Sequence, residues 1–250
     1  MFRHIALALL LFLLLLISLQ WLIPALGIPF YILPTPSSVF ERLLNPDLQE
    51  SMLPHAGSTA LAGMGGFLIG STVGFGLALI FVHVPLIEQT FSPWVVALQT
   101  VPLVAIAPLL LLWFGNGLLT RMIMAALFTV FPVLVNAVRG LRQANPATQD
   151  LLQSYAISNW QRFWVLRLPN SLPYLFTGLK IGSTLAILGA IVAEFEGADQ
   201  GLGFVITIST YYLDTPRTFA AITLASLLSL SLYLLLTGLE RWIIFWPEPA

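Results

Sequence analysis

The scarcity of charge along this chain limits most strongly what it can fold into. Only 8% of its 250 residues are charged and 58% are hydrophobic, and the mean hydropathy is +0.92. Soluble domains carry roughly 25% charged residues, and much of any folded surface stays in contact with water. A soluble fold of this size could not hide so many apolar side chains, so the sequence predicts an integral membrane protein.

Six stretches are long and apolar enough to cross a bilayer. A spanning helix needs about 20 mostly apolar residues, and the sequence predicts such helices at residues 5–23, 58–82, 94–114, 121–138, 174–193 and 218–238. We therefore expect an all-α integral membrane protein, with residues 1–250 forming one transmembrane domain. Pro102 and Pro108 interrupt the third stretch. This favours a helix inside the bundle or beside a path, where neighbouring groups satisfy the freed carbonyls.

The first apolar stretch has a second interpretation, as a secretory signal peptide. Arg3 precedes the stretch, and Ala25-Leu26-Gly27 weakly resembles a cleavage site. The apolar part of a signal peptide is about 7–15 residues long, and residues 5–23 exceed that length. A retained first span is therefore favoured, and the signal peptide stays the alternative.

The arginines orient the predicted spans. Six spans place both termini on one side, and the side richer in Lys and Arg is cytoplasmic. With cytoplasmic termini, Arg42, Arg121 and Arg217 lie outside. The arginines inside are Arg3, Arg139, Arg142, Arg162, Arg167 and Arg241. We therefore expect both termini in the cytoplasm.

Glycines recur every four residues in the second span, at Gly66, Gly70 and Gly74. Such a stripe lets another helix approach closely. Packing within the bundle is the favoured interpretation, and an interface with another subunit is the alternative.

The segment after the first span, residues 33–58, is too polar to cross a membrane. Its Pro36-Ser-Ser start is followed by the apolar pairs Val39-Phe40 and Leu43-Leu44. This pattern predicts a short interfacial helix on the outer side.

Residues 139–173, between the fourth and fifth spans, form a long cytoplasmic loop on this topology. They predict two short amphipathic helices. One face of the first carries Leu151, Leu152 and Tyr155. The second runs from Trp160 to Leu168, with Ser158-Asn159 as its cap and Leu168-Pro169 as its end. The residues alone allow two functions: a hairpin on the membrane surface with its arginines toward anionic lipid, or a docking element for a partner's groove.

Within this loop, the run from Asp150 to Ala156, Asp-Leu-Leu-Gln-Ser-Tyr-Ala, resembles the EAA loop of binding-protein-dependent ABC importer permeases. That family's pattern is Glu-Ala-Ala, three residues, Gly, and then Ile-x-Leu-Pro. This chain departs from the pattern in four places. Asp150 stands for the Glu, Leu151 and Leu152 for the alanines, Ala156 for the Gly, and Arg167 fills the position before Leu168-Pro169. Asp keeps the carboxylate, whereas Ala lacks glycine's access to positive φ, so the turn here can differ from the family's.

Three further stretches resemble the same family. They are Ile32-Leu-Pro-Thr-Pro-Ser-Ser-Val39-Phe, then Gln99-Thr-Val-Pro102-Leu-Val-Ala-Ile-Ala-Pro108-Leu with Leu112-Trp-Phe-Gly115-Asn-Gly, and Val192-Ala-Glu194-Phe-Glu-Gly197-Ala-Asp-Gln-Gly201-Leu-Gly203. In this order and spacing they resemble the nitrate/sulfonate/taurine type of importer permease over nearly the whole chain. The third span leans toward the branch for pyrimidine precursors of thiamine and similar heteroaromatics.

The resemblance implies an ABC importer permease of a bacterial plasma (inner) membrane. Its solute would be small and polar: a nitrate-, sulfonate- or taurine-like anion, or a pyrimidine-type vitamin precursor. The implied partners are a cytoplasmic ATP-binding subunit, an extracytoplasmic solute-binding protein, a second permease copy (identical or related) and membrane lipid. ATP would bind to the partner subunit, and we expect no cofactor in this chain. The residues implied in ATPase coupling are Asp150, Leu151, Leu152, Tyr155, Ala156, Trp160 and Arg162.

The sequence also disfavours several function classes. It has no GxxxxGK[ST] motif, and its only lysine, Lys180, follows a leucine, so energy must come from a partner. It has no Cys, HExxH or nucleophile motif, so we expect neither a metal site nor an enzyme. A net charge of −1 argues against nucleic acid. The alternative is an ion-coupled secondary transporter, which typically shows intramembrane carboxylates or matched broken helices.

A few polar residues in or beside the spans are candidates for lining a solute path. These are Gln99, Thr100, Asn116 and Glu194. Glu194 lies with Glu196 and Asp199 at the outer end of the fifth span. We expect these carboxylates to be solvated or to contact the binding protein, and a solute gate is the alternative.

Overall fold

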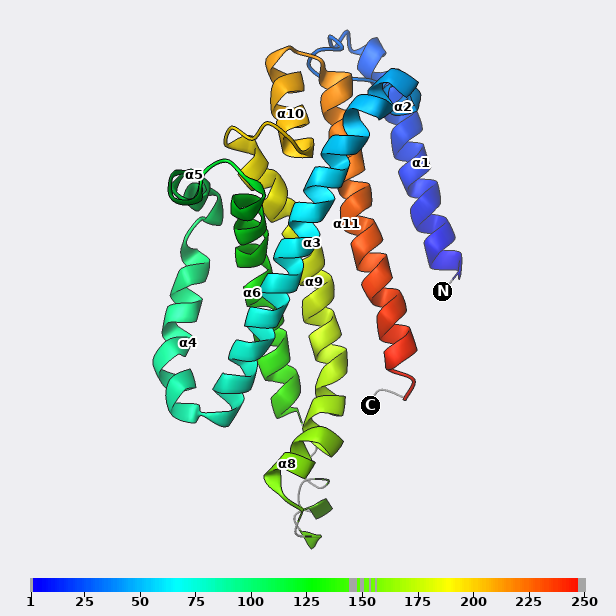
Figure 1. The fold of residues 1–250 in the computed structure, drawn as a ribbon. Coiled ribbons are helices and arrows are strands. Elements are labelled where there is room, and N and C mark those ends of the chain that lie inside the picture. Colours follow the sequence, from blue (N-terminus) through cyan, green and yellow to red (C-terminus); the bar gives the residue numbers. More distant parts are fainter. Residues whose placement is uncertain (1, 144–147, 149–150, 153, 156, 247–250) are drawn as a thin grey trace.

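The computed structural model describes residues 2–143, 148, 151–152, 154–155 and 157–246, and of residues 2–5, 8–9, 47–50 and 98–99 only the backbone. Long helices stand side by side, with short helices at both ends (Figure 1). The described residues contain no strand, which confirms the predicted all-α fold. The α-helices are α1 (Phe2–Ala25), α2 (Pro36–Leu44), α3 (Pro46–His83), α4 (Pro85–Thr100), α5 (Ala107–Phe114), α6 (Leu118–Arg142), α8 (Asn159–Arg162), α9 (Leu168–Phe195), α10 (Leu202–Tyr211) and α11 (Thr215–Ile243).

Four described helical stretches are long and apolar enough to cross a membrane. They are Ser51–His83, Leu118–Arg142, Asn159–Phe195 and Thr215–Ile243. These stretches contain the second, fourth, fifth and sixth predicted spans, and the first predicted span lies within α1. Shorter apolar helices include Leu103–Phe114 and Leu202–Tyr211.

The third predicted span, residues 94–114, is divided between two helices. α4 begins earlier, at Pro85, and ends at Thr100, after which a 3-10 turn leads into α5. α5 turns away from the direction of α4 (Figure 1). Pro102 explains the break, because it has no N–H to continue the helix and disfavours a helical residue before it. Pro108 lies in the first turn of α5, where its missing N–H costs nothing.

α6 lies at the centre of the bundle, and glycines let α3 and α9 approach it closely. A Cβ at Gly70 or at Gly74 would lie 2.6 Å from a backbone carbonyl oxygen of α6. On α9, a Cβ at Gly178 would lie 2.8 Å from the Pro132 oxygen. The glycine stripe of the second span therefore packs within the chain, which confirms the favoured interpretation.

The predicted short helix after the first span is α2. Its inward side chains Val39 and Leu43 pack against a buried cluster that joins α3, α9, α10 and α11, whereas Phe40 is exposed. Gln20 of α1 accepts a hydrogen bond from the Ser37 N–H at 3.0 Å. Apart from this region, α1 stands away from the bundle (Figure 1). We call the end of the molecule with α2 and α10 the α10 end, and the opposite one the α8 end.

Candidate functional site

The first candidate site is the described part of the segment between α6 and α9, residues 148, 151–152, 154–155 and 157–167, which we call the inner segment. It projects past the ends of α6 and α11 at the α8 end (Figure 1). Leu151, Leu152 and Ser154 are helical, as predicted for the first short helix. Asp150 and Ala156, two of the residues implied in coupling, lie outside the described residues.

A capping box begins α8. The Gln161 N–H donates to the Ser158 hydroxyl oxygen at 3.2 Å, and the Ser158 N–H donates to Gln161 Oε1 at 2.9 Å. These two bonds satisfy donors that a helix start otherwise leaves free. The predicted cap at Ser158 is therefore confirmed.

The prediction that Leu168-Pro169 stops this second helix is wrong. Residues Asn159–Phe195 form one continuous helical stretch, in which the π-helix η2 (Phe163–Arg167) joins α8 to α9. The Leu168 N–H donates to the Phe163 oxygen, five residues earlier. This wider turn comes just before Pro169, whose ring would clash with the carbonyl one turn back in a regular α-helix. The part of the inner segment formed by α8 and η2 is thus a direct extension of α9.

The side chains of the inner segment differ in burial. Phe163 and Leu166 are buried, and Phe163 packs against the ends of α3 and α6. Trp160 stacks on Phe163, with ring centroids 6.3 Å apart, and is still 70% exposed. Before it, Tyr155 is 72% and Leu151 is 55% exposed, whereas Leu152 and Arg162 are half-buried. Phe163 and Leu166 therefore anchor the segment to the bundle, whereas Leu151, Tyr155 and Trp160 are exposed apolar and aromatic side chains.

An apolar cavity of about 260 Å³ lies where this extension meets the end of α3. Ring centroids of His83 and Phe163 are 5.6 Å apart, and those of Trp160 and Trp164 are 5.5 Å apart. Aromatic contacts of this kind stabilise packing beyond the area that they bury. These contacts fix the position of the exposed Trp160 ring.

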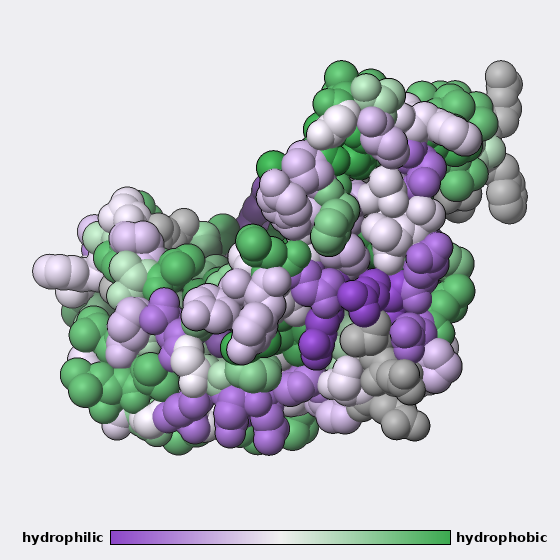
Figure 2. All heavy atoms as spheres, turned by 90° about the horizontal axis from the view of Figure 1, so that it is seen from above, coloured by the Kyte–Doolittle hydropathy of each residue, from purple (hydrophilic) through white to green (hydrophobic). Residues whose placement is uncertain are grey.

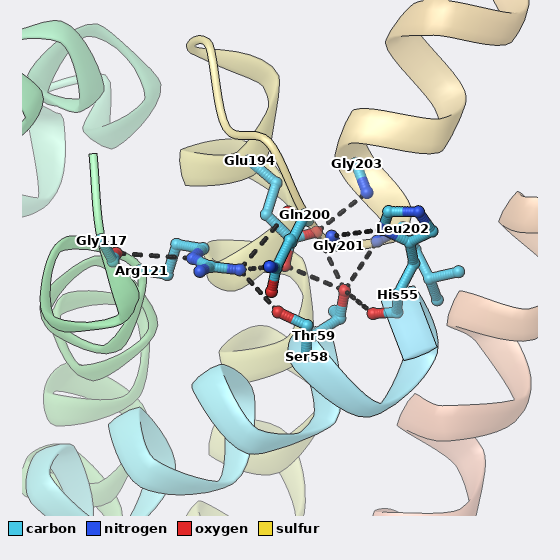
Figure 3. A network of polar contacts seen from close by, with 10 residues as sticks. All are labelled: His55, Ser58, Thr59, Gly117, Arg121, Glu194, Gln200, Gly201, Leu202 and Gly203. Carbon is cyan, nitrogen blue, oxygen red and sulfur yellow. Dashed lines mark hydrogen bonds and ion pairs between the residues drawn. The ribbon is translucent and has the colours of Figure 1, made fainter. Parts of the chain in front are cut away.

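The second candidate site is a polar network at the α10 end, where α3, α6, α9 and the start of α10 meet (Figure 3). Glu194 is its centre and is 1% exposed. Its carboxylate accepts hydrogen bonds from the Thr59 hydroxyl at 2.9 Å and from the Gly203 N–H at 2.8 Å. The Leu202 N–H donates to the Thr59 oxygen at 2.8 Å. Side chains of α3 and α9 therefore cap the free N–H groups of α10.

Arg121 of α6 provides the opposite charge in this Glu194 network. Its Nη1 lies 3.9 Å from a Glu194 oxygen and donates to Ser58 Oγ at 2.7 Å and to the Gln200 carbonyl at 3.3 Å (Figure 3). Arg121 is 7% exposed. A charged pair this deeply buried persists only when other hydrogen bonds satisfy both groups, as they do here.

The expectation that Glu194 is solvated is wrong. The last turn of α9 directs this side chain between α3 and α10 (Figure 3), whereas Glu196 and Asp199 beyond the helix end are exposed as expected. Sequence position alone could not separate these three carboxylates, because the turn that buries one of them depends on where α10 packs.

The loop between α9 and α10 is held by further contacts to this network. The Gly201 N–H donates to His55 Nδ1 at 3.1 Å, and Asn116 Nδ2 donates to the Gly197 carbonyl at 2.6 Å. Both glycines have a positive φ, which is 89° at Gly197 and 110° at Gly201. This conformation favours glycine. Within the described residues, no three His, Cys, Asp or Glu side chains gather as a metal site. The network is thus a set of satisfied contacts that fixes this loop to the bundle.

The four path candidates are only partly brought together. Asn116 and Glu194 both contact the segment around residues 197–203. Thr100 ends α4, and its hydroxyl donates to the Ala97 carbonyl of the same helix at 2.7 Å. The side chain of Gln99 is not described. Whether these residues line a path stays a prediction.

Sequence reasoning missed Thr59, His55 and the structural role of Arg121. Arg121 was counted only as a positive charge outside the membrane. The one sequence signal for its burial is its position at the start of an apolar span, because a charged side chain within a span needs an oppositely charged partner.

The surface of the α10 end combines polar and apolar parts. Seen from above, hydrophilic side chains gather between apolar regions (Figure 2). The exposed large side chains at this end include Phe30, Phe40, Tyr211, Tyr212 and Leu213.

Known proteins resemble this chain over most of its length. Residues 66–245 match the family described as "Binding-protein-dependent transport system inner membrane component". The riboflavin transport system permease protein of Chloroflexus aurantiacus is 35% identical over 88% of this chain and 82% of its own length. The formylaminopyrimidine transport permease protein of Halalkalibacterium halodurans is 34% identical over 86% of each chain. The taurine transport system permease protein of Escherichia coli is 27% identical over 92% of this chain and 86% of its own.

Proposed function

Because the chain belongs to the binding-protein-dependent transport system inner membrane components, the permeases of ABC importers, we propose that a separate ATPase docks on its inner segment and drives a small heteroaromatic solute across the membrane. The chain is a membrane-spanning permease, and members of this family work with an ATPase and a solute-binding protein. The docking residues, the solute and the orientation are our proposals.

The exposed face of the inner segment is the observation that carries the docking proposal. Leu151, Tyr155 and Trp160 expose more than half of their surface at the α8 end, where Leu151 and Tyr155 precede the apolar stretch Asn159–Phe195 and Trp160 lies in its first turn. Apolar and aromatic anchors on a rigid helix are typical of helix-in-groove recognition. A hairpin lying flat on the membrane would instead place these side chains toward lipid, alongside the spans.

The continuous helix from α8 to α9 explains how docking would move the bundle. Displacement of α8 acts directly on α9, because the helix continues through η2 without a break. Phe163 of η2 also stays packed against α3 and α6. ATP shifts such an equilibrium only as far as the ATPase binds the two bundle conformations unequally. The permease itself therefore supplies the lever, and the partner supplies the energy.

Co-purification tests the docking proposal. We expect the Leu151→Asp/Tyr155→Asp double variant to lose an ATPase that co-purifies with the unmodified permease, because two carboxylates replace apolar anchors. The matched control is Trp242→Asp/Phe245→Asp, which changes two even more exposed apolar residues near the C-terminal end of α11. This control should keep the ATPase bound.

Two results would contradict the docking proposal. One is equal loss of the ATPase in both double variants. The other is full solute transport by proteoliposomes that contain no ATPase, which would instead support an ion-coupled secondary transporter.

We propose a neutral or weakly charged heteroaromatic compound as the solute. Two relatives at 34–35% identity are named for riboflavin and formylaminopyrimidine, whereas the taurine permease is 27% identical. This pattern supports the heteroaromatic class over the sulfonate-like anions that the sequence also allowed. In importers of this kind the binding protein selects much of the solute.

Solute binding by the partner protein tests this class. The binding protein that co-purifies with the permease is titrated with riboflavin, a formylaminopyrimidine and taurine, and its melting temperature is followed. We expect stabilisation by a ring compound, because a ligand that binds only the folded state raises stability. Stabilisation by taurine alone would overturn the heteroaromatic proposal without affecting the docking proposal.

We also propose that the α8 end is cytoplasmic. The start of α1 and the end of α11 both point toward the α8 end (Figure 1), which agrees with the arginine distribution. The chain has no cysteine, so a single cysteine can report its side. A membrane-impermeant maleimide should label Leu213→Cys from outside intact cells and should not label Gln143→Cys; the reverse pattern inverts the topology.

A further inference from the structure

An ion pair that the docking proposal does not use joins α9 to α11. Lys180 Nζ lies 2.8 Å from Glu240 Oε2, and the two side chains are 18% and 21% exposed. Leu236 of α11 belongs to a buried apolar cluster with residues of α3, α6 and α9, and Leu179 packs against that cluster. Charged groups in apolar spans are costly and are retained when they pair or serve a function.

A groove shows why this pair matters for the contact between the two helices. On the side toward α10, a groove of about 620 Å³ opens along α9 and α11. Thr184 on α9 and Tyr233 on α11 lie at its end nearest the pair. Lys180 is one helical turn beyond Thr184, and Glu240 is two turns beyond Tyr233. The ion pair therefore ties the helices together just past the point where their side chains leave an open groove.

The other end of α11 is fixed to the elements of the α10 end. Asp214, its N-cap residue, forms an ion pair with Arg42 of α2 at 3.4 Å. The Thr215 hydroxyl donates to the Tyr31 carbonyl at 2.6 Å. Ala220 and Ala221 lie in one buried cluster with Leu202 and Val205 of α10. α11 thus runs from the Lys180–Glu240 pair to α2 and α10.

We infer that Lys180 and Glu240 are positioning residues that make α11 follow α9 during transport. The inference rests on the proposed docking of an ATPase on the inner segment. Movement of α8 passes along the continuous helix to Lys180, and the ion pair passes it to α11. Separation of the two helices at this level would leave each charge without its partner in apolar surroundings, which is strongly unfavourable. α11 then carries the movement to α2 and α10.

A double substitution that removes both charges separates this role from folding. Lys180→Met/Glu240→Met leaves no unpaired charge, and replacing even a fully buried pair by apolar residues of similar size is often neutral for stability, whereas this pair is only partly buried. The permease–ATPase–binding-protein complex is reconstituted, and solute transported per ATP hydrolysed is measured. We expect this ratio to fall by roughly fivefold or more, the lower end of usual coupling factors, with assembly unchanged. The matched control, Leu179→Met/Leu236→Met, introduces the same side chains beside the pair and should keep the ratio.

The exchanged pair provides the rescue. Lys180→Glu/Glu240→Lys restores the ion pair with opposite polarity, so the transport ratio should return close to that of the unmodified complex. If the Met/Met variant assembles and keeps the original ratio, the inference is overturned. If it fails to assemble, the exchanged pair decides: an assembled complex with a low ratio contradicts the inference, and a restored ratio supports it. An unmodified complex that neither hydrolyses ATP nor transports would contradict the docking proposal instead.

Discussion

Glu194→Ala tests whether the Glu194 network holds α10 to the bundle. The carboxylate accepts hydrogen bonds from Thr59 and Gly203 and lies 3.9 Å from Arg121, in a site from which solvent is excluded. Alanine removes both acceptor oxygens and the negative charge together. Glu194→Gln removes the charge but keeps one oxygen as an acceptor.

The geometry sets the size of the expected loss. A buried N–H without an acceptor costs about 1–3 kcal/mol, which applies to Gly203. Thr59 has a second acceptor in the His55 carbonyl at 3.2 Å, so its hydroxyl adds little. Loss of one partner of a buried ion pair costs about 3–5 kcal/mol, and the lower end applies because Arg121 keeps its bonds to Ser58 and Gln200. We expect Glu194→Ala to destabilise this region by about 4 kcal/mol, and Glu194→Gln, which loses the ion pair but keeps an acceptor for the Gly203 N–H, by about 3 kcal/mol.

Amide hydrogen exchange of the purified permease in nanodiscs measures this loss locally. About 4 kcal/mol corresponds to a roughly thousandfold increase in local opening, so amides over residues 202–205 should exchange much faster in Glu194→Ala. Glu196→Ala is the control, because Glu196 is exposed two residues later. Unchanged exchange in Glu194→Ala, or equal acceleration in Glu196→Ala, would refute the view that Glu194 caps α10.

Three further substitutions test packing, a cap and a strained turn. Gly70→Ala places a Cβ 2.6 Å from the Ala126 carbonyl oxygen, a backbone atom, so the yield of monodisperse protein by size-exclusion chromatography should fall; Gly76→Ala, which meets nothing within 4 Å, should not lower it. Ser158→Ala removes a capping-box partner and should destabilise α8 by about 1 kcal/mol. Amide exchange should then become faster over residues 159–162 and stay unchanged over α10. Leu213 is exposed with a φ of 58°, so Leu213→Gly should keep or raise the melting temperature, whereas Leu213→Val should lower it because β-branched residues tolerate this region worst. A lower melting temperature for the glycine variant than for the valine variant would show that Leu213 makes a contact worth more than its strain.

The sequence predicted the elements whose signals are local. Apolar length alone placed four of the six predicted spans within long apolar helices, because a bilayer requires about 20 apolar residues in any helix that crosses it. The cap predicted at Ser158 depends on residues close to one another in the chain, and it formed as predicted, with Gln161 as its second partner. The EAA-like run identified the family that the comparisons show.

Local signals misled where packing decides the outcome. Pro169 is a strong local stop, yet the helix continues through a π turn, because Phe163 and Leu166 bury their side chains only if the helix runs on into α9. Pro102, a residue of the same kind, does break its helix. No rule based on neighbouring residues separates these two prolines.

By itself, the sequence determined that this chain is an all-α membrane protein of the ABC importer permease family, because hydropathy and short motifs depend only on residues near one another in the chain. Only the tertiary structure decided which polar groups meet: Glu194 with Arg121 and Thr59, and Lys180 with Glu240. These partners are separated by 60 to 135 positions. Their contact depends on the rotation of each helix about its axis, which is set by close packing against neighbouring helices and leaves no mark in the local pattern of either partner.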